Sequence, residues 1–309
     1  MDWRDNIETA SKRISGHVRR TPVMEAAAFG LHGSIELKFE HMQHTGSFKA
    51  RGAFNTLLSN SVPEAGVVAA SGGNHGAAVA YAAAKLGRKS RIYVPEMAGS
   101  AKISLIRRQG AELRVVPGEY SSAMSEAREY ETRTGAMQIH AYDAPDTIAG
   151  QGTLMREWER QGLKADTVLI AVGGGGLVAG SMAWLQGRRK IVAVEPETSP
   201  ALNAALKAGK PVDVDVSGIA ANALGARSAG SICFQLAREL AIESVLVSDD
   251  AIRCAQTALW RDLRQMVEPA GATALAALIS KSYMPEKNER ISVLVCGGNT
   301  EPDHFNGGG

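Results

Sequence analysis

The sequence predicts an α/β fold with two open, twisted and mainly parallel sheets that are flanked by helices. Short apolar runs with strand character alternate with segments of helical periodicity between residues 66 and 134. The same alternation resumes between residues 167 and 295. Strands that alternate with helices in this way form parallel βαβ units. The 309 residues, 45% of them hydrophobic, suffice for two such halves, and we place their boundary near residue 140.

The first 58 residues supply a helix, a strand and a second helix. The first helix is amphipathic, covers residues 2–18 and ends near Gly16, and the strand is the apolar run at 35–39. The second helix follows Ser47, whose side chain can cap its start. Lys49 then lies in the first turn, where the helix dipole does not favour a cation. This placement indicates a lysine that is needed as a neutral amine, although a solvated lysine fits the stretch alone equally well.

The remaining elements alternate along the chain. In the first half we expect strands at 66–70, 91–94 and 112–116 and helices at 74–86, 101–109 and 121–134. In the second half we expect strands at 167–172, 190–194, 244–247 and 290–295 and helices at 145–161, 177–185, 200–208, 249–266 and 271–280. Residues 209–232 are expected to be irregular. Because ligands of open parallel sheets bind beyond the carboxyl ends of strands, motifs that follow a strand are the candidates for a site.

The composition and the cysteine pattern favour a cytoplasmic protein. The net charge is +2, and no basic block indicates binding to nucleic acid or to an anionic membrane. The apolar runs are too short to cross a bilayer, and the polar N-terminus lacks the apolar segment of a signal peptide. The three cysteines are widely separated, which fits a reducing compartment.

Four consecutive glycines, Gly173, Gly174, Gly175 and Gly176, follow the predicted strand at 167–172. Glycines allow positive φ and let backbone N–H groups converge, and such a turn at a helix start binds phosphate. The alternative is a plain strand-to-helix turn, which rarely needs four glycines. The pattern is neither the G-x-G-x-x-G dinucleotide motif nor a Walker A loop.

A second glycine-rich turn, Ser71-Gly72-Gly73-Asn74-His75-Gly76, follows the strand at 66–70. Its hydroxyl and N–H groups can bind a substrate carboxylate. The Asn74 amide both donates and accepts, so it can hydrogen-bond to an oxygen substituent of a ligand. His75 is either a general acid or, in the reading that we favour, a hydrogen-bond partner at the helix start.

Two further motifs lie near the end of the chain. Cys296 and Gly297 follow the last strand, where a small polar side chain can contact the edge of a flat ligand. A buried cysteine that only fills space is an equally good explanation. Glu268 precedes a proline that fixes a helix start. An acid there either complements the helix dipole or acts near a reactive lysine.

Together these motifs fit one ligand, with a phosphate for the glycines, an aldehyde for Lys49 and a ring nitrogen for Cys296. Pyridoxal phosphate (PLP) has all three. The stretch Thr45-Gly46-Ser47-Phe48-Lys49-Ala50-Arg51-Gly52-Ala53, the 71–76 turn, the four glycines and Cys296-Gly297-Gly298-Asn299 resemble, in this order, the fold type II PLP enzymes. Within these enzymes the chain is similar to the serine/threonine dehydratases (threonine ammonia-lyases) and the serine racemases.

This resemblance implies a tryptophan synthase β-subunit-like fold with two domains. Residues 1–54 and 141–309 would form a large PLP-binding domain, and residues 55–140 a small, mobile domain on the substrate side. It also implies that Lys49 carries the cofactor covalently and removes the α-proton of the substrate. The other cofactor-binding residues would be Phe48 on the ring face, Asn74 at the ring hydroxyl, Gly173 to Gly176 at the phosphate, Cys296 at the ring nitrogen, and Glu268 and Gly297 beside them.

The substrate-binding residues implied by the resemblance are Ser71, Gly72, Gly73, Asn74 and His75, with Ser71 and its neighbours at the carboxylate. Serine racemases have a second serine at the position of Gly72 as the base on the other face, so racemisation is not expected here. A thiol at the ring nitrogen does not strongly favour a pyridinium, which makes the ring a weaker electron sink and favours loss of a β-hydroxyl.

Two other departures from the family pattern concern regulation. Several relatives bind a divalent ion through an acid at the position of Glu195, but Ala201 stands where the second acid would be. We therefore expect no metal site, or a weakened one. The chain ends soon after the last motif, so we do not expect the regulatory extension of biosynthetic threonine dehydratases or inhibition by isoleucine.

The function predicted from the sequence is a PLP-dependent dehydratase that converts a β-hydroxy amino acid, such as L-threonine or L-serine, to a 2-oxo acid and ammonia. The alternatives are an amino-acid racemase and a dehydratase of a bulkier 3-hydroxy amino acid, such as phenylserine or one derived from hydroxyectoine. The small-residue loop at 217–228 either lines a side-chain pocket or is a surface connection. An NAD-dependent oxidoreductase would explain the glycines but neither Lys49 nor Cys296. A homodimer is expected from the resemblance alone.

Overall fold

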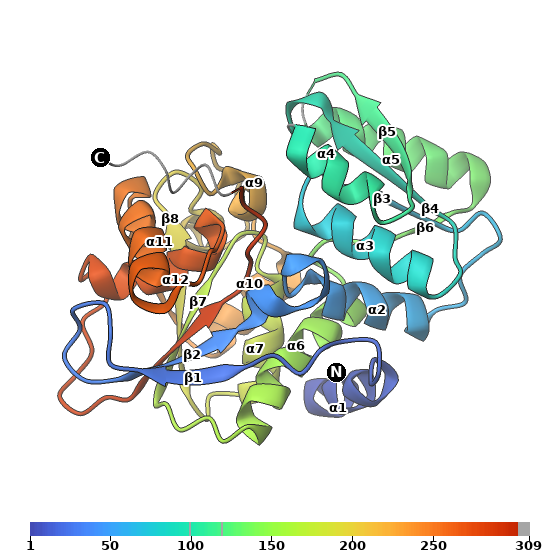
Figure 1. Cartoon of the computed structure of the whole chain (residues 1–309). Coiled ribbons are helices and arrows are strands. Elements are labelled where there is room, and N and C mark those ends of the chain that lie inside the picture. Colours follow the sequence, from blue (N-terminus) through green and yellow to red (C-terminus); the bar gives the residue numbers. More distant parts are fainter. Residues whose placement is uncertain (99, 119, 302–309) are drawn as a thin grey trace.

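The computed structural model describes residues 1–98, 100–118 and 120–301, and the strands among them form two sheets (Figure 1). The larger sheet has six strands in the order β1-β2-β10-β7-β8-β9. These strands are parallel except for β1, which pairs antiparallel with β2 at one edge. The smaller sheet has four parallel strands in the order β5-β4-β3-β6. The predicted α/β fold with two mainly parallel sheets is therefore confirmed.

The bounds of the elements are as follows. The strands are β1 (Val23–Ala26), β2 (Ile35–Phe39), β3 (Val67–Ala70), β4 (Ser90–Pro95), β5 (Glu112–Val116), β6 (Met137–Gln138), β7 (Thr167–Ala171), β8 (Lys190–Pro196), β9 (Glu243–Val247) and β10 (Ile291–Val295). The α-helices are α1 (Trp3–Arg13), α2 (Lys49–Ser59), α3 (Asn74–Lys85), α4 (Ser100–Arg107), α5 (Tyr120–Thr134), α6 (Pro145–Arg160), α7 (Gly176–Leu185), α8 (Ala201–Ala208), α9 (Ala221–Leu224), α10 (Ser231–Glu239), α11 (Asp249–Leu263) and α12 (Pro269–Ile279). Short 3-10 turns are η1 (Glu40–Met42), η2 (His44–Gly46) and η3 (Glu96–Ala98).

Most elements lie within a few residues of their predicted positions, and four short elements are not predicted. Strands β1 and β6 have four and two residues, which is too short for a pattern of alternation. Helix α9 and the start of α10 lie in the segment that we expected to be irregular, so that expectation is wrong in part. Small residues and glycines surround both helices, and they mask the weak helical periodicity.

The larger sheet is a buried layer between helices. Strands β7 and β10 are buried along their whole length, which explains why they appear in the sequence as continuous apolar runs. Helices α11 and α12 cover one face of this sheet, and α6 and α7 lie on the other (Figure 1). This arrangement follows from right-handed crossovers between parallel strands. The smaller sheet carries α3 to α5, and its core also includes the apolar side of α2.

Helix α6 holds α2 and α7 at close range through glycines. A Cβ atom on Gly150 of α6 would lie 2.7 Å from the Cα atom of Gly52 in α2. A Cβ atom on Gly180 of α7 would lie 2.5 Å from the backbone N of Gly152 in α6. Helices that pack this closely have little freedom to shift. Because α2 begins at Lys49 and α7 begins at the last of the four glycines, α6 fixes the spacing of the two motifs.

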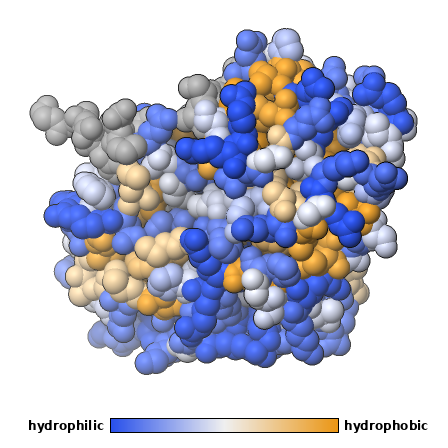
Figure 2. Space-filling model, turned by 45° about the vertical axis from the view of Figure 1, so that its right-hand side comes forward, coloured by the Kyte–Doolittle hydropathy of each residue, from blue (hydrophilic) through white to orange (hydrophobic). Residues whose placement is uncertain are grey.

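The face of the molecule in Figure 2 is largely hydrophilic, and its hydrophobic residues gather in separate patches. Within the described ranges, no helix is both long enough and apolar enough to cross a membrane.

Candidate active site

The Lys49 segment is attached to the carboxyl end of β10. The backbone N–H of Phe48 donates to the Cys296 carbonyl at 3.2 Å, and Ser47 forms an antiparallel bridge with Gly297. Ser47 does not cap the helix, so this detail of the sequence analysis is wrong. The helix starts one residue later, after Phe48, because the backbone of Ser47 is extended and paired with Gly297. The Ser47 hydroxyl is buried without a hydrogen-bond partner among the described residues.

The Lys49 side chain is partly buried, and its amine has one hydrogen-bond acceptor among the described residues. Its Nζ donates to the Ala141 carbonyl at 2.8 Å and lies 5.1 Å from the centre of the Phe48 ring. Burial lowers the pKa of Lys49 to about 8, against an opposing effect of Cys296. The neutral amine that the sequence position indicates is therefore accessible near neutral pH.

The four glycines form a turn in which a side chain at any of the four positions would overlap a neighbouring residue. Gly175 has a φ of +94° and caps α7, and a side chain there would overlap the Cys233 thiol. A side chain on Gly174 would overlap the ring of Tyr142. The Gly174 carbonyl accepts the N–H of Gly230 at 3.0 Å, which fixes the turn. A fixed glycine turn at a helix start is suited to binding a phosphate.

The 71–76 turn lies against α9. The Ser71 hydroxyl accepts the N–H of Gly73 at 3.2 Å, and a Cβ atom on Gly73 would lie 3.1 Å from the carbonyl oxygen of Asn222 in α9. His75 is buried, and its Nε2 makes a 2.9 Å hydrogen bond to the Ile139 carbonyl. Burial lowers the pKa of His75 to about 3, and the Lys49 charge acts in the same direction. A neutral imidazole that is bonded to the backbone acts here as a structural partner.

Gly72 has no room for a side chain. A Cβ atom there would overlap the methyl group of Ala98 and lie 3.3 Å from Cγ1 of Val94. This position therefore lacks both the functional group and the space for a second serine.

Asn74 joins the small sheet to the large one. Its Nδ2 donates to Oε1 of Glu268 at 2.5 Å, and its Oδ1 accepts from Nδ2 of Asn299 at 2.7 Å. The same Asn299 amide donates to the Thr45 carbonyl at 2.7 Å. Thr45 has a φ of +60°, an unfavourable conformation that these contacts support. One network thus connects the start of α3, the Lys49 loop and the end of β10.

Cys296 is a buried thiol. Its Sγ lies 3.3 Å from the Ala270 carbonyl, to which it donates. Burial, with the nearby Glu268 carboxylate, raises the pKa of Cys296 above its usual range, so the thiol stays protonated. A Cβ atom on Gly297 would overlap Oε1 of Glu268, so a side chain there would displace the carboxylate that accepts from Asn74.

Hydrogen bonds connect Asn74, Glu268, Gly297, Cys296 and the Lys49 segment. Gly73 and Gly173 both lie against α9, and Glu195 lies near Cys233, which neighbours Gly175. Ala141, Tyr142 and Asn299 contact these residues and are not among the predicted site residues, whereas Asn222 belongs to the 217–228 loop that the sequence offers as a possible side-chain pocket. Asn299 belongs to a motif that we singled out, so its polar side chain is a signal that could have identified it. Ala141 and Tyr142 lie in the segment between β6 and α6, and Ala141 and Asn222 make their contacts through backbone carbonyls that no residue type reveals.

Glu195 accepts hydrogen bonds from the backbone at the start of a helix. Its carboxylate accepts the N–H groups of Leu202 and Asn203, both at 2.7 Å, at the beginning of α8. Burial raises the pKa of Glu195 to about 7. Ala201 is fully buried beside it. In the ranges that the structure describes, no cluster of three or more His, Cys, Asp or Glu residues has the arrangement of a metal site.

Comparison with known proteins decides between the ligands that such a site could bind. The family model described as pyridoxal-phosphate dependent enzyme matches residues 14–297. The chain belongs to this family of PLP-dependent enzymes. It is 34% identical over 300 residues to a phenylserine dehydratase of Ralstonia pickettii, with 95% of this chain and 92% of that protein covered. It is 36% identical to a biosynthetic L-threonine dehydratase of Salmonella typhimurium over 91% of this chain, but it spans only 58% of that protein.

Among solved structures of this family, maize serine racemase superposes with a TM-score of 0.90 at 30% sequence identity, covering 97% of this chain and 94% of that one. The residues of the site fit PLP. The glycine turn provides N–H groups for the phosphate, and Lys49 provides an amine of lowered pKa. Two buried hydroxyl groups beside Lys49, on Thr45 and Ser47, lack hydrogen-bond partners among the described residues, which indicates a polar group of a ligand nearby.

Proposed function

We propose that this protein is a PLP-dependent ammonia-lyase that converts a β-hydroxy amino acid, such as L-threonine or L-serine, to a 2-oxo acid and ammonia. The observation that carries the proposal is the Lys49 amine, which has a pKa of about 8 and is held 2.8 Å from the Ala141 carbonyl. The next residue, Tyr142, packs on the glycine turn, so consecutive residues contact the amine and the proposed phosphate site. Relatives named phenylserine dehydratase and L-threonine dehydratase support this reaction class.

Lys49 is the residue that transfers a proton in this reaction. Bound PLP supplies an electron sink that acidifies the α-hydrogen of the amino acid. Lys49 accepts that proton at Nζ, since with a pKa of about 8 roughly a tenth of the amine is unprotonated at pH 7. Loss of the α-proton and of the β-hydroxyl together removes water, and hydrolysis of the released enamine product gives the 2-oxo acid and ammonia.

The surrounding groups bind and orient. The glycine turn at 173–176 binds the phosphate, and the 71–75 turn binds the substrate carboxylate through the Ser71 hydroxyl and backbone N–H groups. Asn74 directs its amide toward the cofactor ring hydroxyl, and Glu268 and Asn299 hold that amide in place. Cys296 presents a protonated thiol to the ring nitrogen, which keeps the ring a weak electron sink and favours elimination.

A racemase is the second candidate, because maize serine racemase has a similar structure. The position of Gly72 argues against it, since a serine there would overlap Ala98. A substrate with a larger side chain remains in the proposal, because the backbone of α9, at Asn222 and Leu224, lies against both Gly73 and Gly173. This contact supports the reading of the 217–228 loop as part of the substrate pocket.

The test is an assay of 2-oxo acid formation by the purified protein with PLP. L-Threonine, L-serine and L-threo-phenylserine are compared, and D-serine production from L-serine is followed by chiral chromatography. The proposal predicts an oxo acid from at least one of the three and no D-serine. D-Serine without an oxo acid would establish the racemase instead. The Lys49→Ala variant is the control and should form neither product.

The assembly and the location of the protein complete the proposal. We expect a homodimer in the cytoplasm, on the family resemblance and the cysteine pattern. Light scattering during size-exclusion chromatography tests the dimer, and a mass near the 32.6 kDa of one chain would contradict it.

A further inference from the structure

Arg51 is a buried residue near Lys49 that forms ion pairs with two carboxylates. It follows Lys49 by two residues in the first turn of α2 and is 1% exposed. Its guanidinium bonds to both oxygens of Glu40, with Nε at 2.5 Å and Nη2 at 3.1 Å. Nη2 also lies 3.0 Å from Oε2 of Glu157 in α6. Such a two-pronged pair fixes direction as well as distance, which a lysine cannot do.

The charges form a closed, neutral group. Lys38 of β2 is fully buried and bonds to Oε1 of Glu157 at 2.6 Å. The four residues Lys38, Glu40, Arg51 and Glu157 thus carry two positive and two negative charges. The two carboxylates keep Arg51 charged and raise its pKa, although burial opposes them. A buried ion pair of this kind adds little net stability, because desolvation offsets the attraction. Its value lies in the geometry that it imposes.

The partners of Arg51 are the elements that carry the rest of the site. Glu40 directly follows β2, whose last residue Phe39 pairs with Val295, the residue before Cys296. Glu157 and Thr153 lie on α6, which follows the segment that contains Ala141, the acceptor of the Lys49 amine. The guanidinium therefore ties the start of α2 both to the strand end next to Cys296 and to the helix next to Ala141.

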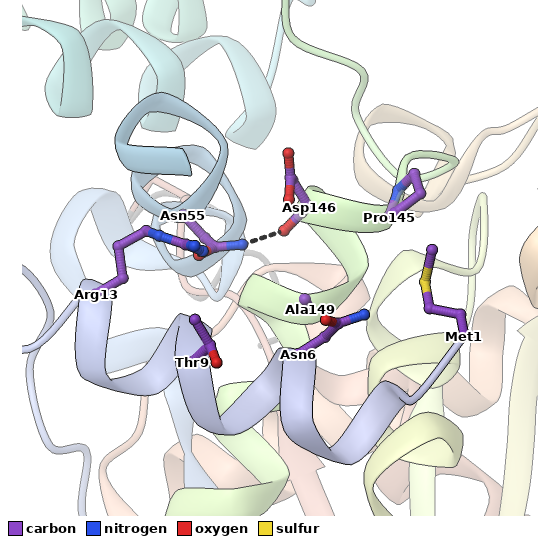
Figure 3. A pocket seen from close by; sticks show the side chains of 8 residues that line it. All are labelled: Met1, Asn6, Thr9, Arg13, Asn55, Pro145, Asp146 and Ala149. Carbon is purple, nitrogen blue, oxygen red and sulfur yellow. Dashed lines mark hydrogen bonds between the residues drawn. The ribbon is translucent and has the colours of Figure 1, made fainter. Parts of the chain in front are cut away.

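One turn further along, a second polar anchor holds α2 on α6. The Asn55 amide donates to the Asp146 carbonyl at 2.7 Å, at the edge of a cavity of about 270 Å³ between α1, α2 and α6 (Figure 3). Gly52 lies between the two anchors, against Gly150. With polar anchors on both sides of a close contact, α2 cannot slide along α6 without breaking buried hydrogen bonds.

We propose that Arg51, held by Glu40 and Glu157, is a positioning residue that sets the reach of the Lys49 amine into the active site. The inference rests on the proposed role of Lys49, but it does not depend on which amino acid is the substrate. A merely structural role would affect unfolding alone. A positioning role also changes the fit between Lys49 and the cofactor.

The experiment compares the holoenzyme variants Arg51→Lys, Arg51→Met and Glu40→Gln with Arg156→Lys and Arg156→Met. Arg156 is the matched control, because it is a buried arginine of α6 that pairs with Glu8 at 2.6 Å, and α1 rather than α2 carries that partner. Two readouts need no substrate: the PLP that remains per chain after dialysis, and the wavelength and pH midpoint of its visible absorbance band. Thermal unfolding and the separate kcat and KM for the best substrate complete the set.

We expect Arg51→Met to retain less PLP, to shift the pH midpoint of the band and to lower kcat by about a hundredfold with a smaller change in KM. Arg51→Lys should restore part of each effect. The Arg156 variants should lower only the unfolding temperature. The inference is overturned if the Arg51 variants lower the unfolding temperature as the Arg156 variants do but leave PLP retention, the band and kcat unchanged.

If Arg51→Met does not fold, Arg51→Lys and Glu40→Gln decide by the same readouts. A protein that forms no oxo acid still gives both substrate-free readouts, so failure of the proposed function is recognised separately.

Discussion

Replacement of Gly175 by alanine should weaken both the fold and the binding of PLP. Gly175 has a φ of +94°, so any other residue there is strained by roughly 1–2 kcal/mol. The new methyl group would also overlap the Cys233 thiol, and overpacking of a buried site costs about 1–3 kcal/mol. Together the two effects predict a loss of about 2–5 kcal/mol in the free energy of unfolding. If the turn moves to relieve the overlap, the phosphate site is distorted as well.

Gly162 offers a matched control, because it has the same φ of +94° but no neighbouring atom within 4 Å of a Cβ position. Gly162→Ala should therefore lose only about 1–2 kcal/mol, from strain alone, and should bind PLP normally. Urea unfolding and a PLP titration of both variants separate strain from overlap. Addition of Cys233→Ala to Gly175→Ala should recover part of the loss. If Gly175→Ala is no less stable than Gly162→Ala and binds PLP as the native chain does, the overlap that we derive from the structure is wrong.

Three further predictions concern other parts of the structure. Gly72→Ser should reduce 2-oxo acid formation without producing D-serine, and the added change Ala98→Gly should restore part of the lyase activity; racemisation by the single variant would refute the steric argument. The pKa of His75 is lowered to about 3, so the unfolded chain binds one more proton than the native one between about pH 3 and pH 6.5, and stability falls as the pH decreases through this window. His75→Gln should show a smaller loss between pH 6.5 and pH 4.5 in urea unfolding, and an unchanged pH dependence would contradict the assignment. Because Glu195 already accepts two backbone N–H groups, neither Mg²⁺ nor EDTA should change the unfolding temperature, and a clear increase with Mg²⁺ would indicate a metal site that the geometry does not suggest.

The sequence was sufficient for most of the strands and helices and for the glycine-rich turns after strands, because these depend on local patterns, but not for β1, β6, α9 and α10. Buried strands such as β7 and β10 are continuous apolar runs, and glycine clusters mark the turns after strands. The sequence does not show contacts that a side chain makes with a backbone group distant in the chain. The bond from Lys49 to the Ala141 carbonyl is such a contact, and no residue type at position 141 announces it.

The missed helix cap has a similar cause. Ser47 is a good capping residue by type, but its backbone pairs with Gly297, which lies 250 positions later. Tertiary pairing therefore decided the conformation of Ser47 against its local preference. The division into domains at residues 54 and 140 stays a prediction. The apolar side of α2 belongs to the core of the smaller sheet, while Arg51 of the same helix bonds to residues of the larger one.

The role of Lys49 is the central claim, and the absorbance spectrum of the purified protein tests it most directly. With PLP bound covalently to Lys49, we predict a band near about 410–420 nm that decreases when L-threonine or another substrate is added, as a 2-oxo acid appears. Lys49→Ala should lack this band. If the native protein, supplied with PLP, shows no such band, or if Lys49→Ala shows the same band as the native protein, then Lys49 does not carry the cofactor.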